Sequence, residues 1–278
     1  PLVISFPFLN PEFKNLHQLH LYQIDAFTDE IFGGNPACVV PLSDWLPDET
    51  LLKIARENAV AETAFFVNNG FKIHLRWFTP ETEMDLCGHA TLATAHALRE
   101  IRKYSREKII FKTQSGDLEV FVKEDRYTLN FPSRKPVPTP LPPLLKKSLN
   151  LQPQEVLKAR DFVLVYPREE DVTNIKIDRI PFDQLELGTG GVIVTAPGSD
   201  CDFVSRFFTP GASVFEDPVT GSAHCSLIPY WHEKLEKQEM FAKQISARGG
   251  KLFCKNKGER VLISGNARTY SIGKIWVP

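Results

Sequence analysis

The chain has 278 residues, 42% of them hydrophobic and 24% charged, which is enough for one large core or two of about 130 residues each. Its 33 Lys and Arg residues balance 34 Asp and Glu residues, so no excess charge is available to hold nucleic acid or an anionic membrane surface. Five cysteines without a CxxC pair are typical of free thiols in a reducing compartment, so we expect a cytoplasmic protein. No apolar run approaches the roughly 20 residues that cross a membrane, and residues 1–15 lack the pattern of a signal peptide.

Short β-rich runs with mostly short connections fill the first half, as antiparallel pairing permits. They are residues 21–27, 33–42, 61–67, 71–78, 108–113, 116–123 and 126–131. One helix is predicted over 47–59, opening with Pro47 and the expected cap Asp48. Its apolar side should lie on a sheet face. That side consists of Leu51, Leu52, Ile54 and Ala55.

A proline-rich segment between Phe131 and Leu144 separates two parts of the chain. Its six prolines cannot keep donating backbone hydrogen bonds to a sheet or a helix. We therefore expect one domain at 17–133 and a second at 134–268. Beyond the segment the β-rich runs resume, at 161–166, 191–196, 203–208, 260–265 and 271–277.

A sequence pattern recurs with an offset of 130 residues. Residues 76–80 (RWFTP) are followed after seven residues by Gly88, and residues 206–210 (RFFTP) after ten residues by Gly221. In each copy a strand ends in Thr-Pro, a loop with acidic residues follows, and two small or polar residues open a helix. An internal duplication is the simplest account, and a chance match is the alternative.

The two repeated helices point to the site. The helix predicted over 88–101 has no polar face, so it should run through the middle of its domain. The helix over 221–235 starts similarly, but Pro229 should kink it or shorten its regular part. Helix N-termini bind carboxylates and developing oxyanions, so Gly88-His89 and Gly221-Ser222 could converge on one cleft for a small acid. Alternatively, both glycines only permit close packing of strand on helix.

Glu62 is the candidate acid/base. Period two places it on one strand face with Val60, Ala64 and Phe66, where its carboxyl group would be desolvated. Desolvation raises a carboxyl pKa toward neutrality, which suits a group that both takes and returns a proton. From the residues alone, a partly exposed glutamate on an edge strand is an equal interpretation.

Asp217 and His89 are candidates for hydrogen bonding in the same cleft. Asp217 lies four residues before Gly221, and His89 directly follows Gly88. The plainer interpretations are an aspartate that orders its own loop and a core histidine with satisfied hydrogen bonds. The paired context of the two helix starts favours a functional role.

Other motifs are weaker. His17 and His20 form HxxH in an irregular region without a third ligand, so we expect no metal. The segment 188–191 (GTGG) lacks the Lys-Ser/Thr of a P-loop. Ser222 does not lie in GxSxG, so a hydrolase elbow is a poor fit.

Four ordered motifs resemble the phenazine-biosynthesis-like (PhzF-like) family, within the diaminopimelate-epimerase-like fold. They are GNPA at 34–37, the ETAF that carries Glu62, GHAT at 88–91 and DPVTGSA at 217–223, and the similarity runs from about Leu19 to the end. The resemblance implies an α+β fold of two pseudo-symmetric domains, each a mostly antiparallel sheet or barrel round a central helix. The last strand, 269–278, would complete the first domain.

The resemblance also implies an isomerase that shuttles a proton without metal or coenzyme, in a homodimer. By this similarity Glu62 moves the proton, while His89 and Asp217, with the amides at Gly221 and Ser222, orient a small carboxylate substrate. The substrate itself is not implied. Arg248 is a further candidate partner for a carboxylate.

Cys87 supports an alternative. Related epimerases and racemases carry two opposed cysteines, whereas here Cys87 precedes Gly88 but Thr220 precedes Gly221. Threonine is too weak an acid or base for two-thiol racemisation, so we expect a proton shift by Glu62 rather than epimerisation. An epimerase or dehydratase that uses Cys87 is the second hypothesis, and a catalytically silent binding or regulatory protein is the third.

Overall fold

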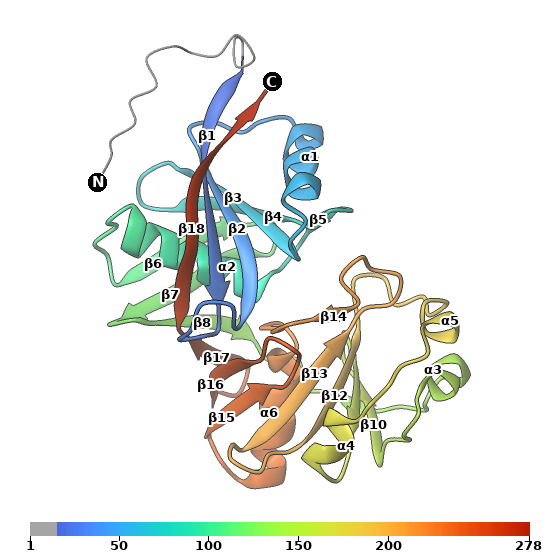
Figure 1. Cartoon of the computed structure of the whole chain (residues 1–278). Helices are drawn as coiled ribbons and strands as arrows, with labels where there is room; N and C mark the ends of the chain where they lie inside the picture. The colour runs from blue at the N-terminus through green and yellow to red at the C-terminus, as the bar shows by residue number, and fades with distance from the viewer. Residues whose placement is uncertain (1–15) are drawn as a thin grey trace.

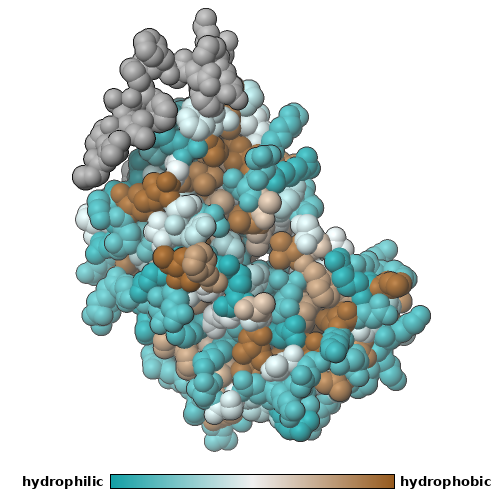
Figure 2. Space-filling view, in the orientation of Figure 1, coloured by the Kyte–Doolittle hydropathy of each residue, from teal (hydrophilic) through white to brown (hydrophobic). Residues whose placement is uncertain are grey.

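The computed structural model describes residues 16–278, which form two halves stacked end to end (Figure 1). The sequence prediction about a signal peptide falls on residues 1–15 and lies outside the described residues. Figure 2 shows that the outline of the molecule is indented where the two halves meet. No helix within residues 16–278 is long and apolar enough to cross a membrane.

The first half is a mixed sheet curved round one helix. Its strands pair in the order β18–β1–β2–β3–β4–β6–β7–β8, and only β2–β3 and β4–β6 are parallel. The HxxH residues His17 and His20 lie on β1, so the prediction of an irregular region there is wrong. The strands are β1 (His17–Ala26), β2 (Asn35–Leu42), β3 (Glu62–Asn68), β4 (Ile73–Phe78), β5 (Glu83–Met84), β6 (Lys108–Thr113), β7 (Gly116–Lys123), β8 (Arg126–Pro132) and β18 (Ala267–Val277).

The helix α2 (Gly88–His96) lies inside the curve of this sheet, and all nine of its residues are buried. Its side chains are mostly alanine and threonine, so strands can approach it closely on every side. The hydroxyl groups of Thr91 and Thr94 donate hydrogen bonds to the backbone carbonyls of Cys87 and Ala90, so these buried hydroxyls have partners within the helix. The helix continues as the π-helical turn η2 (Ala97–Ile101). The prediction of a central helix is confirmed.

The helix α1 (Asp48–Asn58) covers the outer face of β3 and β4, and it buries Leu51, Ile54 and Ala55. The prediction that Asp48 caps this helix is wrong, because Asp48 is its first residue and Pro47 occupies the cap position. The Asp48 carboxylate instead accepts a hydrogen bond from Arg76 at 2.8 Å.

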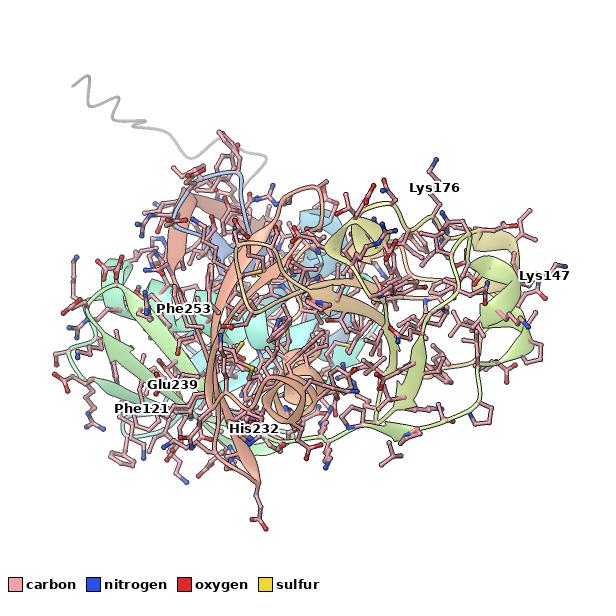
Figure 3. The ribbon with its side chains drawn as sticks, turned by 90° about the horizontal axis from the view of Figure 1, so that it is seen from below. Phe121, Lys147, Lys176, His232, Glu239 and Phe253 are labelled. Carbon is pink, nitrogen blue, oxygen red and sulfur yellow. The ribbon has the colours of Figure 1, made fainter. Side chains whose placement is uncertain are left out.

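The second half repeats this plan. Its strands pair in the order β9–β10–β11–β12–β13–β15–β16–β17, with β11–β12 and β13–β15 parallel. Lys147 and Lys176 mark its outer edge, away from the first half (Figure 3). The strands are β9 (Val137–Pro138), β10 (Glu155–Lys158), β11 (Phe162–Val165), β12 (Val192–Pro197), β13 (Phe203–Phe208), β14 (Glu216–Asp217), β15 (Glu239–Gln244), β16 (Gly250–Asn256) and β17 (Arg260–Gly265). The helices are α3 (Pro143–Ser148), α4 (Glu169–Thr173), α5 (Arg179–Phe182) and α6 (His224–Leu235).

The helix α6 departs from its sequence prediction. It begins at His224, three residues later than expected, because residues 221–226 close with the tighter i to i+3 hydrogen bonds. Pro229 lies inside it without ending it. A proline cannot donate to the carbonyl four residues earlier, that of Cys225, and this carbonyl accepts the backbone N–H of Arg134 at 2.8 Å instead.

The repeat predicted from sequence extends to the topology. The strand β13 spans the same positions as β4 with an offset of 130 residues, and each is followed by a two-residue strand and a buried helix. In both copies an arginine on the long strand holds a glutamate on the short one through two hydrogen bonds. These pairs are Arg76–Glu83, at 2.7 Å for both bonds, and Arg206–Glu216, at 2.7 and 2.9 Å.

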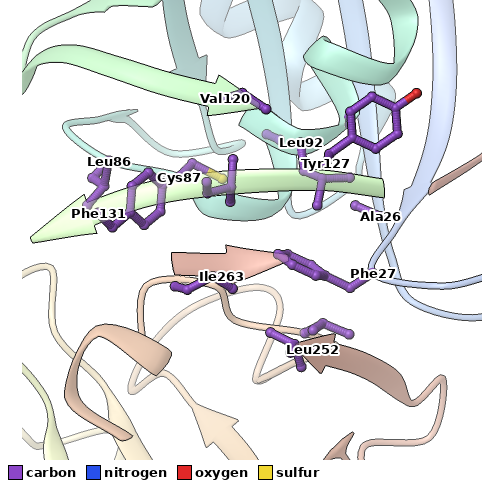
Figure 4. Close-up of a cluster of buried hydrophobic side chains, with 14 of the residues drawn as sticks. Ala26, Phe27, Leu86, Cys87, Leu92, Val120, Tyr127, Phe131, Leu252 and Ile263 are labelled. Atoms are coloured by element: carbon purple, nitrogen blue, oxygen red, sulfur yellow. The ribbon is translucent and has the colours of Figure 1, made fainter. Parts of the chain in front are cut away.

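The two halves share strands and a core at their junction. The strand β8 pairs antiparallel with β17, and β18 returns to pair with β1 along its whole length. Phe27, in the connection after β1, belongs to the same buried cluster as Phe131 of the first half and Leu252 and Ile263 of the second (Figure 4). The core is therefore continuous across the junction.

Candidate active site

A cleft of about 290 Å³ lies between the two halves, where the repeated loops face each other. It is smaller than the sites of most drug-sized ligands, so it suits a small molecule. The structure brings the predicted site residues other than Arg248 to its wall, although their roles stay predictions. These residues are Glu62, Cys87, Gly88, His89, Asp217, Gly221 and Ser222.

Gly88 and Gly221 bring the two helix starts together. A Cβ atom at Gly88 would lie 3.0 Å from the Cα of Gly221, and one at Gly221 would lie 3.2 Å from the Cα of Gly88. These distances are shorter than nine in ten real Cβ contacts, so an alanine at either position would fit only if the backbone of the other glycine moved by a few tenths of an ångström. The plainer interpretation was close packing of strand on helix, whereas each glycine here lies closest to the other one, and this contact places the two helix starts side by side.

Glu62 begins β3 at the base of the cleft, and its side chain is 16% exposed. Its Oε2 lies 3.2 Å from Nε2 of His89, but neither atom has an aligned hydrogen-bond partner within the described chain. Burial raises the pKa of Glu62 from 4.5 to about 8, and the negative charge of Asp217 adds to this. Both protonation states of Glu62 are therefore accessible near neutral pH.

His89 is a neutral imidazole. Burial lowers its pKa to about 3, so the ring carries one proton near neutral pH. Its Nδ1 lies 3.1 Å from the amide nitrogen of Asn35, which can only donate, so the ring proton belongs on Nε2. That N–H lies beside Glu62 Oε2, at 3.2 Å between the heavy atoms, and it has no aligned hydrogen-bond acceptor in the described chain.

Asp217, on the second-half side of the cleft, is held as an anion. Its carboxylate accepts the hydroxyl of Thr220 at 2.5 Å and the amide of Asn35 at 2.7 Å. Gln244 fixes this loop by accepting the backbone N–H of Thr220 and donating to the Asp217 carbonyl. Burial raises the pKa of Asp217 to about 6, and the Thr220 and Asn35 hydrogen bonds oppose the rise. Near neutral pH the pair holds one proton, on Glu62.

Cys87 is a buried thiol, 5% exposed. Burial and the neighbouring Glu62 raise its pKa well above the ordinary value, and the backbone N–H groups of Ala90 and His89 only partly offset this. A thiol of this kind is a poor nucleophile or base near neutral pH. The position of the second thiol is taken by Thr220, whose hydroxyl is already committed to Asp217.

Asn35 belongs to the site but was not predicted. It is fully buried, and its amide nitrogen lies within 3.1 Å of acceptors on His89, Asp217 and Val219, so it ties both halves together. The GNPA motif was the available signal. Its Gly34 has φ of +62°, and a Cβ there would overlap the carbonyl of Ala26, so glycine is required to turn the chain into β2.

Arg160 was also missed, and Arg248 was a wrong candidate. Arg248 donates to Asp25 and to the carbonyls of Gly33 and Gly34, so it clamps the turn before β2 outside the cleft wall. Arg160 lines the cleft and donates to Ser222 at 3.0 Å. No sequence motif marks it, because Ser222 lies 62 positions later and meets it only in the fold.

A metal site has one candidate cluster in the described part of the chain. Ligand atoms of Glu62, Cys87 and His89 lie within 4.8 Å of one another. Zinc usually takes four ligands and thiolate sulfur, whereas the pKa of this thiol is raised. The sequence-based expectation of no metal stays a prediction.

Together, the curved sheets round buried helices and the cleft between the two halves define a protein of the epimerase-like α+β class. A solved hydroxyproline epimerase from Agrobacterium vitis, 10% identical over 93% of this chain and 92% of its own, supports the fold alone, with a TM-score of 0.59. The predicted fold class is confirmed.

The chain belongs to the family described as phenazine biosynthesis-like protein, whose model matches residues 24–273. A solved PhzF-family protein from Enterococcus faecalis is 45% identical, with a TM-score of 0.89 over 94% of this chain and all of its own. An uncharacterized isomerase from Pseudomonas aeruginosa is 47% identical over 93% of this chain and 98% of its own. These relatives confirm the predicted family and the enzyme class, an isomerase.

Proposed function

We propose that the protein isomerises a small carboxylic acid by moving a proton with Glu62, without a cofactor. The observation that carries the proposal is that Glu62 and His89, which face each other on the cleft wall, each have a buried polar atom without a hydrogen-bond partner in the described chain. Glu62 Oε2 and His89 Nε2 are buried without aligned hydrogen bonds in the described chain, and the pKa of Glu62 is raised to about 8. Buried polar atoms without partners are costly, and a bound substrate would satisfy them.

The chemistry follows from the positions of these groups. Ionised Glu62 takes a proton from a carbon next to a conjugated acid, so that a C–H bond breaks and its electron pair moves into the conjugated system. The neutral His89 N–H and the backbone N–H groups at the helix starts stabilise the developing negative charge. Glu62 then returns the proton to another carbon on the same face, and no oxidant or reductant is needed.

The test is deuterium incorporation from heavy water into a panel of small unsaturated acids, followed by proton NMR. Wild-type protein should exchange one carbon-bound hydrogen of an accepted acid, and Glu62→Gln should lose this exchange by about 10²-fold or more. Cys87→Ser is the matched control, because it changes the neighbouring buried group and keeps Glu62. Normal exchange by Glu62→Gln would contradict the proposal.

The Cys87 hypothesis gives the opposite pattern. An epimerase or dehydratase that uses this thiol would lose exchange in Cys87→Ser or after alkylation. The buried, protonated thiol and the committed Thr220 hydroxyl favour the glutamate instead. A binding or regulatory protein without turnover would show no exchange with any acid, although it would still bind one.

We further propose a cytoplasmic homodimer. The described surface exposes large apolar side chains near the β1–β18 edge, which a second copy of the chain could cover. They are Ile31, Phe32, Tyr270 and Ile272, exposed by 47%, 70%, 48% and 61%.

A further inference from the structure

Arg160 is the one cationic side chain among the described residues that line the cleft. Of the other ionisable groups on the wall, Glu81 and Asp217 are carboxylates, His89 is neutral, and Glu62 holds a proton near neutral pH. An anion that enters the cleft is therefore repelled by Glu81 and Asp217. The only attractive side chain is the guanidinium group on the wall of the second half.

A buried partner fixes the Arg160 guanidinium in position. Asp161, 1% exposed, accepts Nε at 3.1 Å and Nη2 at 3.0 Å, and it also accepts the backbone N–H of Gly191 at 2.9 Å. The Asp161 charge is thus shared between the guanidinium and a backbone dipole. A guanidinium fixed along one edge loses little further freedom when its other edge binds a carboxylate.

The free edge of Arg160 leads to Ser222. Nη2 donates to the Ser222 hydroxyl at 3.0 Å, so this hydroxyl keeps its own hydrogen to donate. Within residues 16–278, Nη1 of Arg160 and the N–H groups of Gly221 and Ser222 make no hydrogen bond to the protein. Four donors without a protein acceptor therefore belong to residues on one wall of the cleft, and donors of this kind suit the oxygens of a carboxylate.

A comparison of the two repeated halves explains why the second-half wall of the cleft can bind an anion. Thr63 pairs with Phe78 and Val192 pairs with Phe208, so the counterpart of Glu62 in the second half is Gly191. A Cβ atom at Gly191 would overlap the ring of Phe207, which leaves no room for a second acid. The second half therefore lacks the proton-transfer group of the first and presents Arg160 and Ser222 instead.

We propose that Arg160 and Ser222 bind the substrate carboxylate, with the reacting carbon at the Glu62 end, and that this selects monocarboxylates over dicarboxylates. The inference rests on the proposed function and names its substrate class. A second carboxylate would lie against Asp217 or Glu81 with no cation to balance it, and it would also oppose the ionisation of Glu62 that proton transfer needs. Arg160 is a binding residue in this scheme and takes no part in proton transfer.

The test measures binding of three probes to the full chain by calorimetry or ligand-observed NMR. The probes are benzoate, the neutral benzamide and the dicarboxylate phthalate. Benzoate should bind at least 10-fold more tightly than either of the others. Ser222→Ala, which leaves no buried charge unpaired, should weaken benzoate binding about 5-fold. The double variant Arg160→Met/Asp161→Asn, which removes the ion pair together, should weaken it by 10-fold or more.

Two controls separate this proposal from the proposed function. Lys147→Met removes an exposed cation at the far edge and should bind benzoate like the wild type. Glu62→Gln should keep benzoate binding while losing exchange. If wild type binds benzoate but both Arg160/Asp161 and Ser222 variants bind it equally well, the carboxylate assignment is wrong. If wild type binds no acid at all, the proposed function fails with it.

Discussion

Glu62 occupies a position that costs the folded protein stability. Its carboxyl group is mostly withdrawn from water, and one of its oxygens has no aligned partner in the described chain. A glutamate placed only for stability would pair with a cation or remain exposed. Its neighbours are instead a neutral imidazole, a protonated thiol and an anionic aspartate, so the arrangement favours proton exchange over folding.

This cost predicts a pH-dependent gain in stability for Glu62→Gln. Below pH 4.5 both folded and unfolded wild type hold the proton, and the carboxyl group costs little. Between pH 4.5 and about 8 the unfolded chain ionises while the folded one stays protonated, so wild-type stability falls as pH rises. Glu62→Gln should therefore raise the free energy of unfolding by about 2 kcal/mol at pH 8 and hardly at all at pH 4.

Thermal and urea unfolding across this pH range would measure the difference between variant and wild type. Glu57, an exposed residue of helix α1, gives the matched control. The variant Glu57→Gln should show no such pH-dependent gain in stability. Equal effects of Glu62→Gln at pH 4 and pH 8 would show that burial does not raise the pKa of this carboxyl group.

Asn35 and Arg160 show what could not be predicted at the scale of single residues. Glu62, His89 and Asp217 lie in local motifs, so sequence spacing could nominate them. Asn35 lies in the GNPA motif, but its partner Asp217 is 182 positions away and depends on how the two halves close over each other. Arg160 reaches Ser222 across 62 positions, and this contact depends on how the second half folds. Arg248 was a candidate carboxylate partner in the sequence, but in the structure it donates to Asp25 and to the carbonyl of Gly33 in the turn before β2.

At the scale of elements, the duplication was the most informative sequence feature. It depends on local patterns, namely a strand ending in Thr-Pro and a helix opened by glycine, and it placed β4, α2 and β13 correctly. It did not fix the start of α6, because the second loop is longer and closes with 3₁₀-type bonds. The Arg–Glu pairs on the repeated hairpins also follow the repeat, and they hold each loop at the cleft.

The contact between the two helix starts gives an element-scale prediction. A methyl group at Gly88 would lie 3.0 Å from the Cα of Gly221 and 3.4 Å from the ring of Phe131, so Gly88→Ala must push the two N-termini apart. We expect a loss of roughly 1–3 kcal/mol in the free energy of unfolding and a fall in deuterium exchange, because both sides of the cleft shift.

Denaturant unfolding and the exchange assay measure these two effects. Gly273→Ala, on β18, is the matched control, because nothing lies within 4 Å of the added atom and its φ is not in the left-handed region. It should change stability by no more than about 0.5 kcal/mol. If Gly88→Ala behaves like this control, the helix starts do not constrain each other.

The whole molecule is tied together by strands that leave one half for the other. The pairing of β8 with β17 joins the two sheets, and β18 leaves the second half to complete the sheet of the first beside β1. The buried cluster that contains Phe27 and Phe131 also contains Ile263 and Leu252 from the second half. A site at such a junction keeps its geometry only while both halves are folded.

The shared core predicts a single unfolding transition. Trp77 is buried in the first half and Trp231 in the second, so two variants that each keep one of these as the only tryptophan report on separate halves. Both reporters should give the same denaturant midpoint, because opening either half exposes the common core around Phe27. Phe27→Ala should lower both midpoints together, with a loss of roughly 3–5 kcal/mol. Separate midpoints would instead show that each half folds alone, and the cleft would then depend on docking of two independent domains.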